Sequence, residues 1–157
     1  MAELTTRERP NQIGLTLRIR HPDIDPQQIT TALGMLPLAF WKAGDRRRDS
    51  RGQSLEGHYH ESYWMGTFAA AGRLPAAVST PEATLMLAFT QLRRSKDFLA
   101  RLREEGASVE LVLHVLGGGE LKLHLDPLLC ATLAKIGVTL VLELRAEGEV
   151  QARRMAG

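Results

Sequence analysis

The stretch IGLTLRIRHPDIDPQQITTALG, residues 13–34, decides the fold class. Its first eight residues alternate between apolar side chains and other residues, which predicts a strand with one buried face. Asp25 then offers a helix N-cap, Pro26 suits the first helical position, and Gly34 marks the helix end. The stretch therefore predicts a strand followed directly by a helix.

The last third of the chain repeats these helix start and stop residues. Asp126-Pro127 predicts the start of another helix, Gly137 its end, and residues 138–144 a final strand. Residues 109–116 and 121–125 also alternate, and three glycines separate them, so we expect a hairpin there. A three-residue turn would pair Leu116 with Glu120, His114 with Lys122 and Leu113 with Leu123.

The middle of the chain supplies the other elements. A second strand is expected over residues 59–68, and a long helix runs from Thr80-Pro81 to Gly106 with a weak point at residues 95–97. Residues 35–57 read as irregular. The resulting order is β-α-β-α-β-β-α-β. It predicts an α+β fold with one mixed sheet of about five strands, helices mainly on one face and a polar opposite face, and it suggests a ferredoxin-like duplication.

Length and composition fit one folded domain. A chain of 157 residues with 44% hydrophobic and 24% charged residues can build a core. We expect flexible segments at residues 1–12 and 147–157 around a single domain at 13–146. Cys130, the only cysteine, lies in an apolar run and is expected in the core. The chain lacks a 20-residue apolar stretch, and the cytoplasm is the expected compartment.

The positive charge gathers in one loop. The chain holds 20 Lys and Arg against 18 Asp and Glu, but residues 42–51 alone carry a net +3. Such a loop could bind phosphate, with Trp41 stacking on a base. However, aromatic residues make up only 5% of the chain, and stacking residues are not evident on the expected polar sheet face. The pattern therefore favours an acidic protein partner over nucleic acid, with a solvated loop as the plain alternative.

A pair of histidines raises a metal-assisted hydrolase as the second function class. His58 and His60 would lie about 7 Å apart on one side of a strand, a spacing at which two imidazoles can share a metal. Glu61 would point to the opposite side, and a third ligand is not evident. We therefore expect no cofactor and no metal requirement, with His58 and His60 as weak metal candidates only.

Several segments resemble an uncharacterised bacterial family, domain of unknown function 4279, over roughly residues 13–146. The resemblance rests on these segments: Ile24-Asp25-Pro26, Ile29-Thr30, Leu33-Gly34, Pro37, Lys42-Ala43-Gly44-Asp45, Trp64 and Ile136-Gly137-Val138 to Leu144. It implies no activity, cofactor or catalytic residue. The resemblance implies a turn at Gly44-Asp45 and places a family tryptophan, Trp64, on the second strand. Arg46-Arg47-Arg48 is not part of the family pattern.

Together these features predict a non-catalytic binding or protein-interaction module, comparable to an immunity protein by analogy of size and class alone. The alternatives are the small metal-assisted hydrolase and nucleic-acid binding through residues 42–51. We expect no membrane contact, and the sequence leaves homo-oligomerisation open. The candidate binding residues are Trp41, Lys42, Gly44, Asp45, Arg46, Arg47, Arg48, Arg51 and Trp64. The next candidate surface is the polar sheet face with Arg18, His114, Lys122 and His124.

Overall fold

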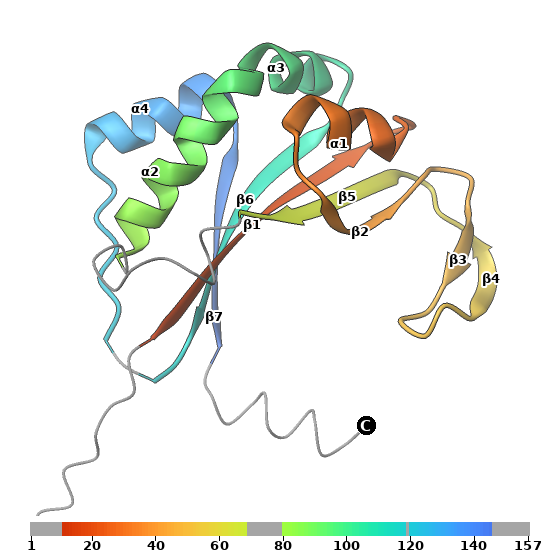
Figure 1. Ribbon diagram of the computed structural model, residues 1–157, viewed down its shortest axis with the longest axis horizontal. Helices are drawn as coiled ribbons and strands as arrows, with labels where there is room; N and C mark the ends of the chain where they lie inside the picture. The colour runs from red at the N-terminus through yellow and green to blue at the C-terminus, as the bar shows by residue number, and fades with distance from the viewer. Residues whose placement is uncertain (1–10, 69–79, 119, 146–157) are drawn as a thin grey trace, which may run out of the picture.

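The computed structural model describes residues 11–68, 80–118 and 120–145 (Figure 1). The expected flexible segments therefore lie almost entirely outside the described residues, although Gln12 already belongs to the first strand. The strands are β1 (Gln12–His21), β2 (Pro37–Trp41), β3 (Arg46–Arg48), β4 (Ser54–His58), β5 (Ser62–Thr67), β6 (Ser108–Leu116) and β7 (Thr139–Arg145). The helices are α1 (Pro26–Leu33), α2 (Pro81–Leu92), α3 (Lys96–Glu104) and α4 (Pro127–Ile136), with a 3-10 turn at Arg93–Ser95.

A mixed sheet of five strands forms the centre of the fold, in the order β2-β5-β1-β6-β7. β1 is antiparallel to both β5 and β6, and β2 is antiparallel to β5, whereas β7 runs parallel to β6. The predicted α+β class with one mixed five-stranded sheet is confirmed. β3 and β4 form a separate two-stranded ribbon beyond the end of β2 and β5.

The four helices lie over one face of the sheet, as predicted (Figure 1). The buried face of β1 supplies Leu15, Leu17 and Ile19, which pack with apolar residues of β6 and of all four helices. Trp64 of β5 is fully buried in this core, and its indole N–H donates to Thr30 Oγ1 of α1 at 3.0 Å. The opposite face of the sheet, the open face, carries no helix among the described residues.

The predicted helix boundaries are confirmed where caps define them. Asp25 Oδ1 accepts from the N–H of Gln27 at 2.9 Å, and Asp126 Oδ1 accepts from the N–H of Leu129 at 2.7 Å. Gly34 ends α1 and Gly137 ends α4, both in the left-handed region. The expected weak point in the long helix is the 3-10 turn that separates α2 from α3.

The predicted hairpin of residues 109–116 and 121–125 is wrong. β6 pairs instead with β1 on one side and β7 on the other, so neither of its edges is free for a hairpin partner. Residues 120–125 form no strand and run beside α2, where the N–H of His124 donates to Glu82 Oε1 at 2.6 Å. Leu121 and Leu123 still pack against the core, which explains why the segment alternates like a strand.

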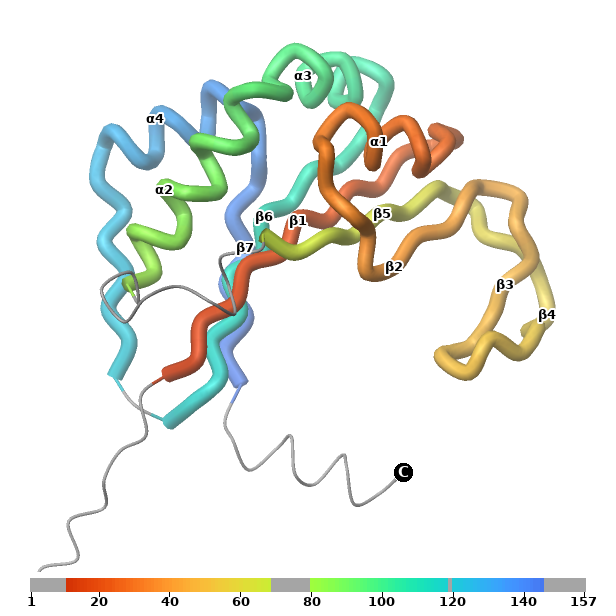
Figure 2. Tube along the Cα trace, viewed as in Figure 1, coloured from red at the N-terminus to blue at the C-terminus, as the bar shows by residue number. Residues whose placement is uncertain are grey.

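The expected irregular region at residues 35–57 is also wrong in part, since it contains β2, β3 and all of β4 except His58. The second predicted strand begins at Ser62 rather than at residue 59. β2 and β5 form the base of one long ribbon, and β3 and β4 form its far end, which bends away from the helix layer (Figure 2). We call this far end, residues 46–58, the β-arm.

Two further features concern side chains and membranes. Cys130 is exposed, contrary to the expected core position. The buried face of α4 is formed by Leu129, Leu133 and Ile136, and Cys130 lies one position off that face. Of the helices that the structure describes, none is long and apolar enough to span a membrane.

Candidate interaction surface

A tight turn at residues 42–45 directs the β-arm away from the sheet. Asp45 Oδ2 accepts from the N–H of Lys42 at 3.1 Å, and the N–H of Asp45 donates to the Lys42 carbonyl at 3.1 Å. Gly44 adopts φ 88°, a conformation that favours glycine. Backbone bonds between this turn and Tyr59 join the two chains of the ribbon at the bend. The Gly44-Asp45 turn of the family pattern therefore forms the bend between the sheet and the β-arm, and several hydrogen bonds hold it.

A stack of three aromatic rings supports the bend. The indole of Trp41 lies between Tyr59 and Tyr63, with ring centroids 4.5 Å and 4.3 Å away and interplanar angles of 14° and 20°. On the far side of Tyr63, the Arg20 guanidinium carbon lies 5.8 Å from the ring centroid. Trp41, Tyr63 and Arg20 are cross-strand neighbours on the open face. Stacked rings of this kind add about 0.5–1.5 kcal/mol per pair, so the stack stabilises the base of the β-arm.

Tyr59 also ties β3 to the stack. Its hydroxyl accepts from the backbone N–H of Arg48 at 3.3 Å and donates to the Arg48 carbonyl at 3.3 Å. At the tip of the β-arm, Asp49 Oδ1 accepts from the backbone N–H groups of Arg51 and Gln53. The carboxylates of Asp45 and Asp49 therefore bind backbone amides of the ribbon.

The basic side chains of the β-arm are exposed on both of its sides. Arg46 and Arg48 line a cleft of about 440 Å³ with Phe40, Trp41, Asp45 and Tyr59. Arg47 lies on another side, in a wider hollow that also contains Trp41, Tyr59, His58, His60 and Glu61. Within the described residues no ion pair joins Arg46, Arg47, Arg48 or Arg51 to a carboxylate. Their donors are therefore free to bind a partner.

The structure separates the candidate binding residues into two groups. Trp41, Asp45, Arg46 and Arg48 meet in one cleft, whereas Lys42 and Arg47 line two other hollows and Arg51 is exposed at the tip of the β-arm. Trp64 is fully buried in the core and does not reach this surface. Phe40, Tyr59 and Tyr63 were missed by sequence reasoning. Phe40 could have been found because it directly precedes Trp41 in the sequence. The contacts of Tyr59 and Tyr63 with Trp41 could not, because they depend on strand pairing.

The open face differs from the sequence expectation, which placed no stacking residues there. Trp41 and Tyr63 both lie on it. Both faces of the Trp41 indole are covered by tyrosines, and Tyr63 lies between Trp41 and Arg20. Burial raises the pKa of the Tyr63 hydroxyl above 10.0, although Arg18 and Arg20 oppose the shift. Because the indole faces are covered, Trp41 offers only its edge to a ligand.

The rest of the open face holds a polar network around Glu143. This carboxylate binds the Arg18 guanidinium and lies 3.1 Å from His114 Nδ1, while His114 Nε2 lies 2.8 Å from Thr16 Oγ1. Burial alone would raise the pKa of Glu143, but the hydrogen bond and charge of Arg18, helped by His114 and Arg145, hold it below 4.5. Arg18 and His114 thus share this face, whereas Lys122 and His124 lie off the sheet. Glu143 thus pairs with both Arg18 and Arg145.

The structure does not place the two metal candidates together on one strand. His58 ends β4 and His60 lies in the following bend, and both are exposed. Among the described residues, no three His, Cys, Asp or Glu side chains are grouped closely enough to hold a metal ion. His114, on the open face, belongs to the Glu143 network.

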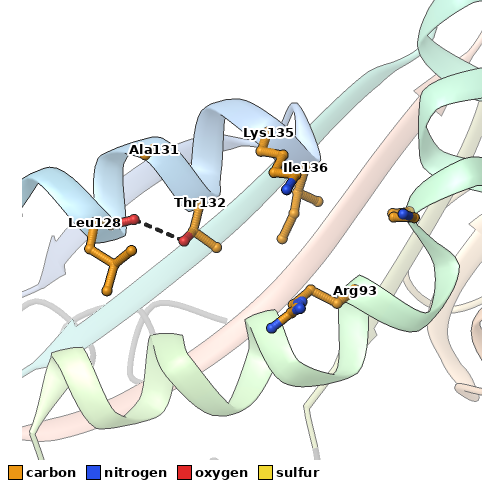
Figure 3. A pocket seen from close by; sticks show the side chains of 7 residues that line it. Arg93, Leu128, Ala131, Thr132, Lys135 and Ile136 are labelled. Carbon is orange, nitrogen blue, oxygen red and sulfur yellow. Dashed lines mark hydrogen bonds between the residues drawn. The ribbon is translucent and has the colours of Figure 1, made fainter.

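A third hollow, of about 410 Å³, lies between α4 and the α2–α3 junction (Figure 3). Leu128 and Ile136 line it together with Arg93, Lys96 and Lys135. Arg93 caps the C-terminal end of α2, and Lys135 lies in the last turn of α4. Cations at these positions interact favourably with the helix dipole. Helix-end electrostatics therefore explain two of its three charges, and the β-arm is the stronger candidate surface.

Comparison with known proteins places the chain in one family. The chain matches no curated protein and no solved structure. The model of one family, described as "Domain of unknown function (DUF4279)", matches residues 11–147. This range spans the whole sheet and all four helices, and the chain therefore belongs to the DUF4279 family.

Proposed function

We propose that this protein is a non-catalytic interaction module that binds an acidic segment of a partner protein through the β-arm. The observation that carries the proposal is the cleft in which Arg46 and Arg48, without ion-pair partners in the described residues, lie beside the exposed ring of Phe40. Arginine and aromatic side chains, phenylalanine among them, are enriched at protein interfaces.

The support beneath the cleft favours binding over a merely solvated loop. The Trp41 stack and the bonds between Tyr59 and Arg48 fix the β-arm relative to the sheet. A partner would therefore meet arginines whose backbone is already ordered, which lowers the entropy lost on binding. The same charges would increase the association rate of an acidic partner.

The geometry also bears on nucleic acid. A base needs a free ring face on which to stack, and both faces of Trp41 are occupied by tyrosines. The arginines could still bind phosphate without reading bases. We therefore favour an acidic protein segment and treat single-stranded RNA as the competing probe.

The test uses a synthetic peptide in which glutamate alternates with valine, titrated at low and at physiological ionic strength. We expect salt-sensitive binding that is weakened about tenfold or more by replacing Arg46, Arg47 and Arg48 with alanine, without a change in melting temperature. The matched control replaces Arg93, Arg94 and Lys96, which are exposed at the α2–α3 junction and carry the same charge. Equal loss in both triple variants would indicate unspecific charge attraction, and tighter binding of single-stranded RNA than of the peptide would assign the β-arm to nucleic acid. Either result would contradict the proposal.

A further inference from the structure

The outer edge of β2 is an open strand edge beside the proposed cleft. β2 is the last strand in the order β2-β5-β1-β6-β7, and β5 is the only described strand paired with it. The backbone N–H and C=O groups that point away from β5 therefore face no neighbouring strand. Such an edge can pair with an added strand from another chain.

This edge carries an unusual set of side chains. Leu36, Leu38 and Phe40 are 85%, 63% and 62% exposed, and they alternate with the half-buried Pro37, Ala39 and Trp41. Soluble proteins commonly protect an open edge with charged residues, proline or a β-bulge, because an exposed apolar edge promotes aggregation. β2 begins with Pro37 and its register shifts between Pro37 and Ala39, but the strand carries no charged residue. Two large exposed apolar side chains on this strand, with Leu36 just before it, are typical of a surface that is covered by a partner.

The charges next to this edge define the partner's chemistry. Phe40 shares its cleft with Arg46 and Arg48, which lie just beyond the C-terminal end of β2. A strand laid along β2 would therefore contact apolar side chains over most of its length and arginines at one end. A second copy of β2 does not fit this requirement, because residues 34–41 contain no Asp or Glu.

We propose that β2 accepts an extended, acidic segment of the partner as an additional strand of the sheet. This inference rests on the proposed function and specifies how the partner binds. Backbone hydrogen bonds to β2 would supply affinity, Leu38 and Phe40 would contact alternate apolar side chains, and the arginines of the β-arm would select carboxylates beyond them.

The test compares the glutamate–valine peptide with two N-methylated versions of it. One version is methylated at the odd-numbered amides and the other at the even-numbered amides, so each lacks the N–H donors of one strand edge. N-methylation keeps the side chains and the charge. We expect one N-methylated version to bind about tenfold more weakly and the other to bind like the parent. We also expect the parent peptide to slow amide hydrogen exchange in β2 but not in β7, the opposite edge strand of the sheet.

Variants separate this inference from the proposed function. Replacing Leu38 and Phe40 with serine should weaken peptide binding, whereas replacing the exposed Leu142 and Leu144 of β7 should not. If both N-methylated versions bind like the parent and exchange slows only in the β-arm, strand addition is refuted while binding by the β-arm stands. If no peptide binds in a salt-dependent manner, both proposals fail. Dimerisation of the free protein that is abolished by the Leu38 and Phe40 variant would also overturn the inference, because a second copy would then occupy β2.

Discussion

The indole ring of Trp41 lies stacked on the phenol ring of Tyr59, with centroids 4.5 Å apart and ring planes inclined by 14°. Trp41 ends β2 in the main sheet, whereas Tyr59 directly follows β4 of the β-arm. The contact thus joins the main sheet to the β-arm at the point where the chain bends. It stabilises the β-arm without adding to the core, because neither ring belongs to the core cluster.

Replacing Tyr59 with alanine should therefore loosen the β-arm and leave the sheet intact. We expect faster hydrogen exchange at the amides of Arg46–Arg48, with a loss in local stability of about 1 kcal/mol, and little change in global melting. Tyr59→Phe keeps the ring but removes the bonds to Arg48, so it should have a smaller effect. Equal exchange rates in the wild type and in the alanine variant would show that the stack does not hold the β-arm.

The two aspartate caps should contribute to stability independently. Asp25 caps α1 and Asp126 caps α4, and loss of such a cap costs about 1 kcal/mol. Asp25→Ala and Asp126→Ala should each lower the free energy of unfolding by about this amount, whereas asparagine at either position should retain most of it. Urea unfolding of the double variant checks additivity. A change in the denaturant slope would indicate that more than a cap was lost.

Glu143 should make folding stability depend on pH in the acid range. Its pKa in the folded protein is held below the ordinary value of 4.5 by Arg18, His114 and Arg145, against the effect of burial. The folded state therefore binds the proton less readily than the unfolded state, so this stabilisation is present above about pH 4.5 and is lost as the pH falls through the folded pKa. Glu143→Gln should be less stable by up to about 1 kcal/mol at neutral pH and should lose less stability on acidification. Parallel acid unfolding curves for both proteins would contradict this.

The parts of the fold that depend on neighbouring residues could be predicted from the sequence. The caps at Asp25 and Asp126 and the terminal glycines Gly34 and Gly137 act within one or two turns, and all four were predicted. Strand alternation at residues 13–20 is equally local, and it predicted β1. The partner of a strand is not local. β6 pairs with β1 and β7, which lie far from it in sequence, while residues 121–125 alternate only because one side rests on the core.

The candidate surface was predicted in its charge, in Trp41 and in the Gly44-Asp45 turn, but not in its arrangement. The +3 balance of residues 42–51 is visible in the sequence and identified the arginines. Their arrangement is not visible, because β3 carries three consecutive arginines without alternation and becomes a strand only by pairing with β4. The Trp41 stack likewise requires Tyr63 to arrive on the adjacent strand. Cys130 shows the same limit on a smaller scale, since an apolar run does not reveal which side of a helix faces the core.

The two helix-ending glycines offer a matched pair for the last prediction. Both adopt positive φ, 62° at Gly34 and 74° at Gly137, so alanine at either position should cost about 1 kcal/mol from backbone strain alone. The space available for an added Cβ differs between the two glycines. A Cβ at Gly34 would meet nothing within 4 Å, whereas a Cβ at Gly137 would displace the guanidinium group of Arg103.

This guanidinium lies at the C-terminal end of α4, where a positive charge interacts favourably with the helix dipole. Gly137→Ala should therefore cost several tenths of a kcal/mol more than Gly34→Ala. In the background of Arg103→Ala, this extra cost should disappear, because the displaced group is already absent, and the two glycine variants should become equal. Urea unfolding of the two glycine variants in both backgrounds measures the difference. An extra cost that persists without Arg103 would mean that the backbone at Gly137, rather than its neighbour, accounts for it.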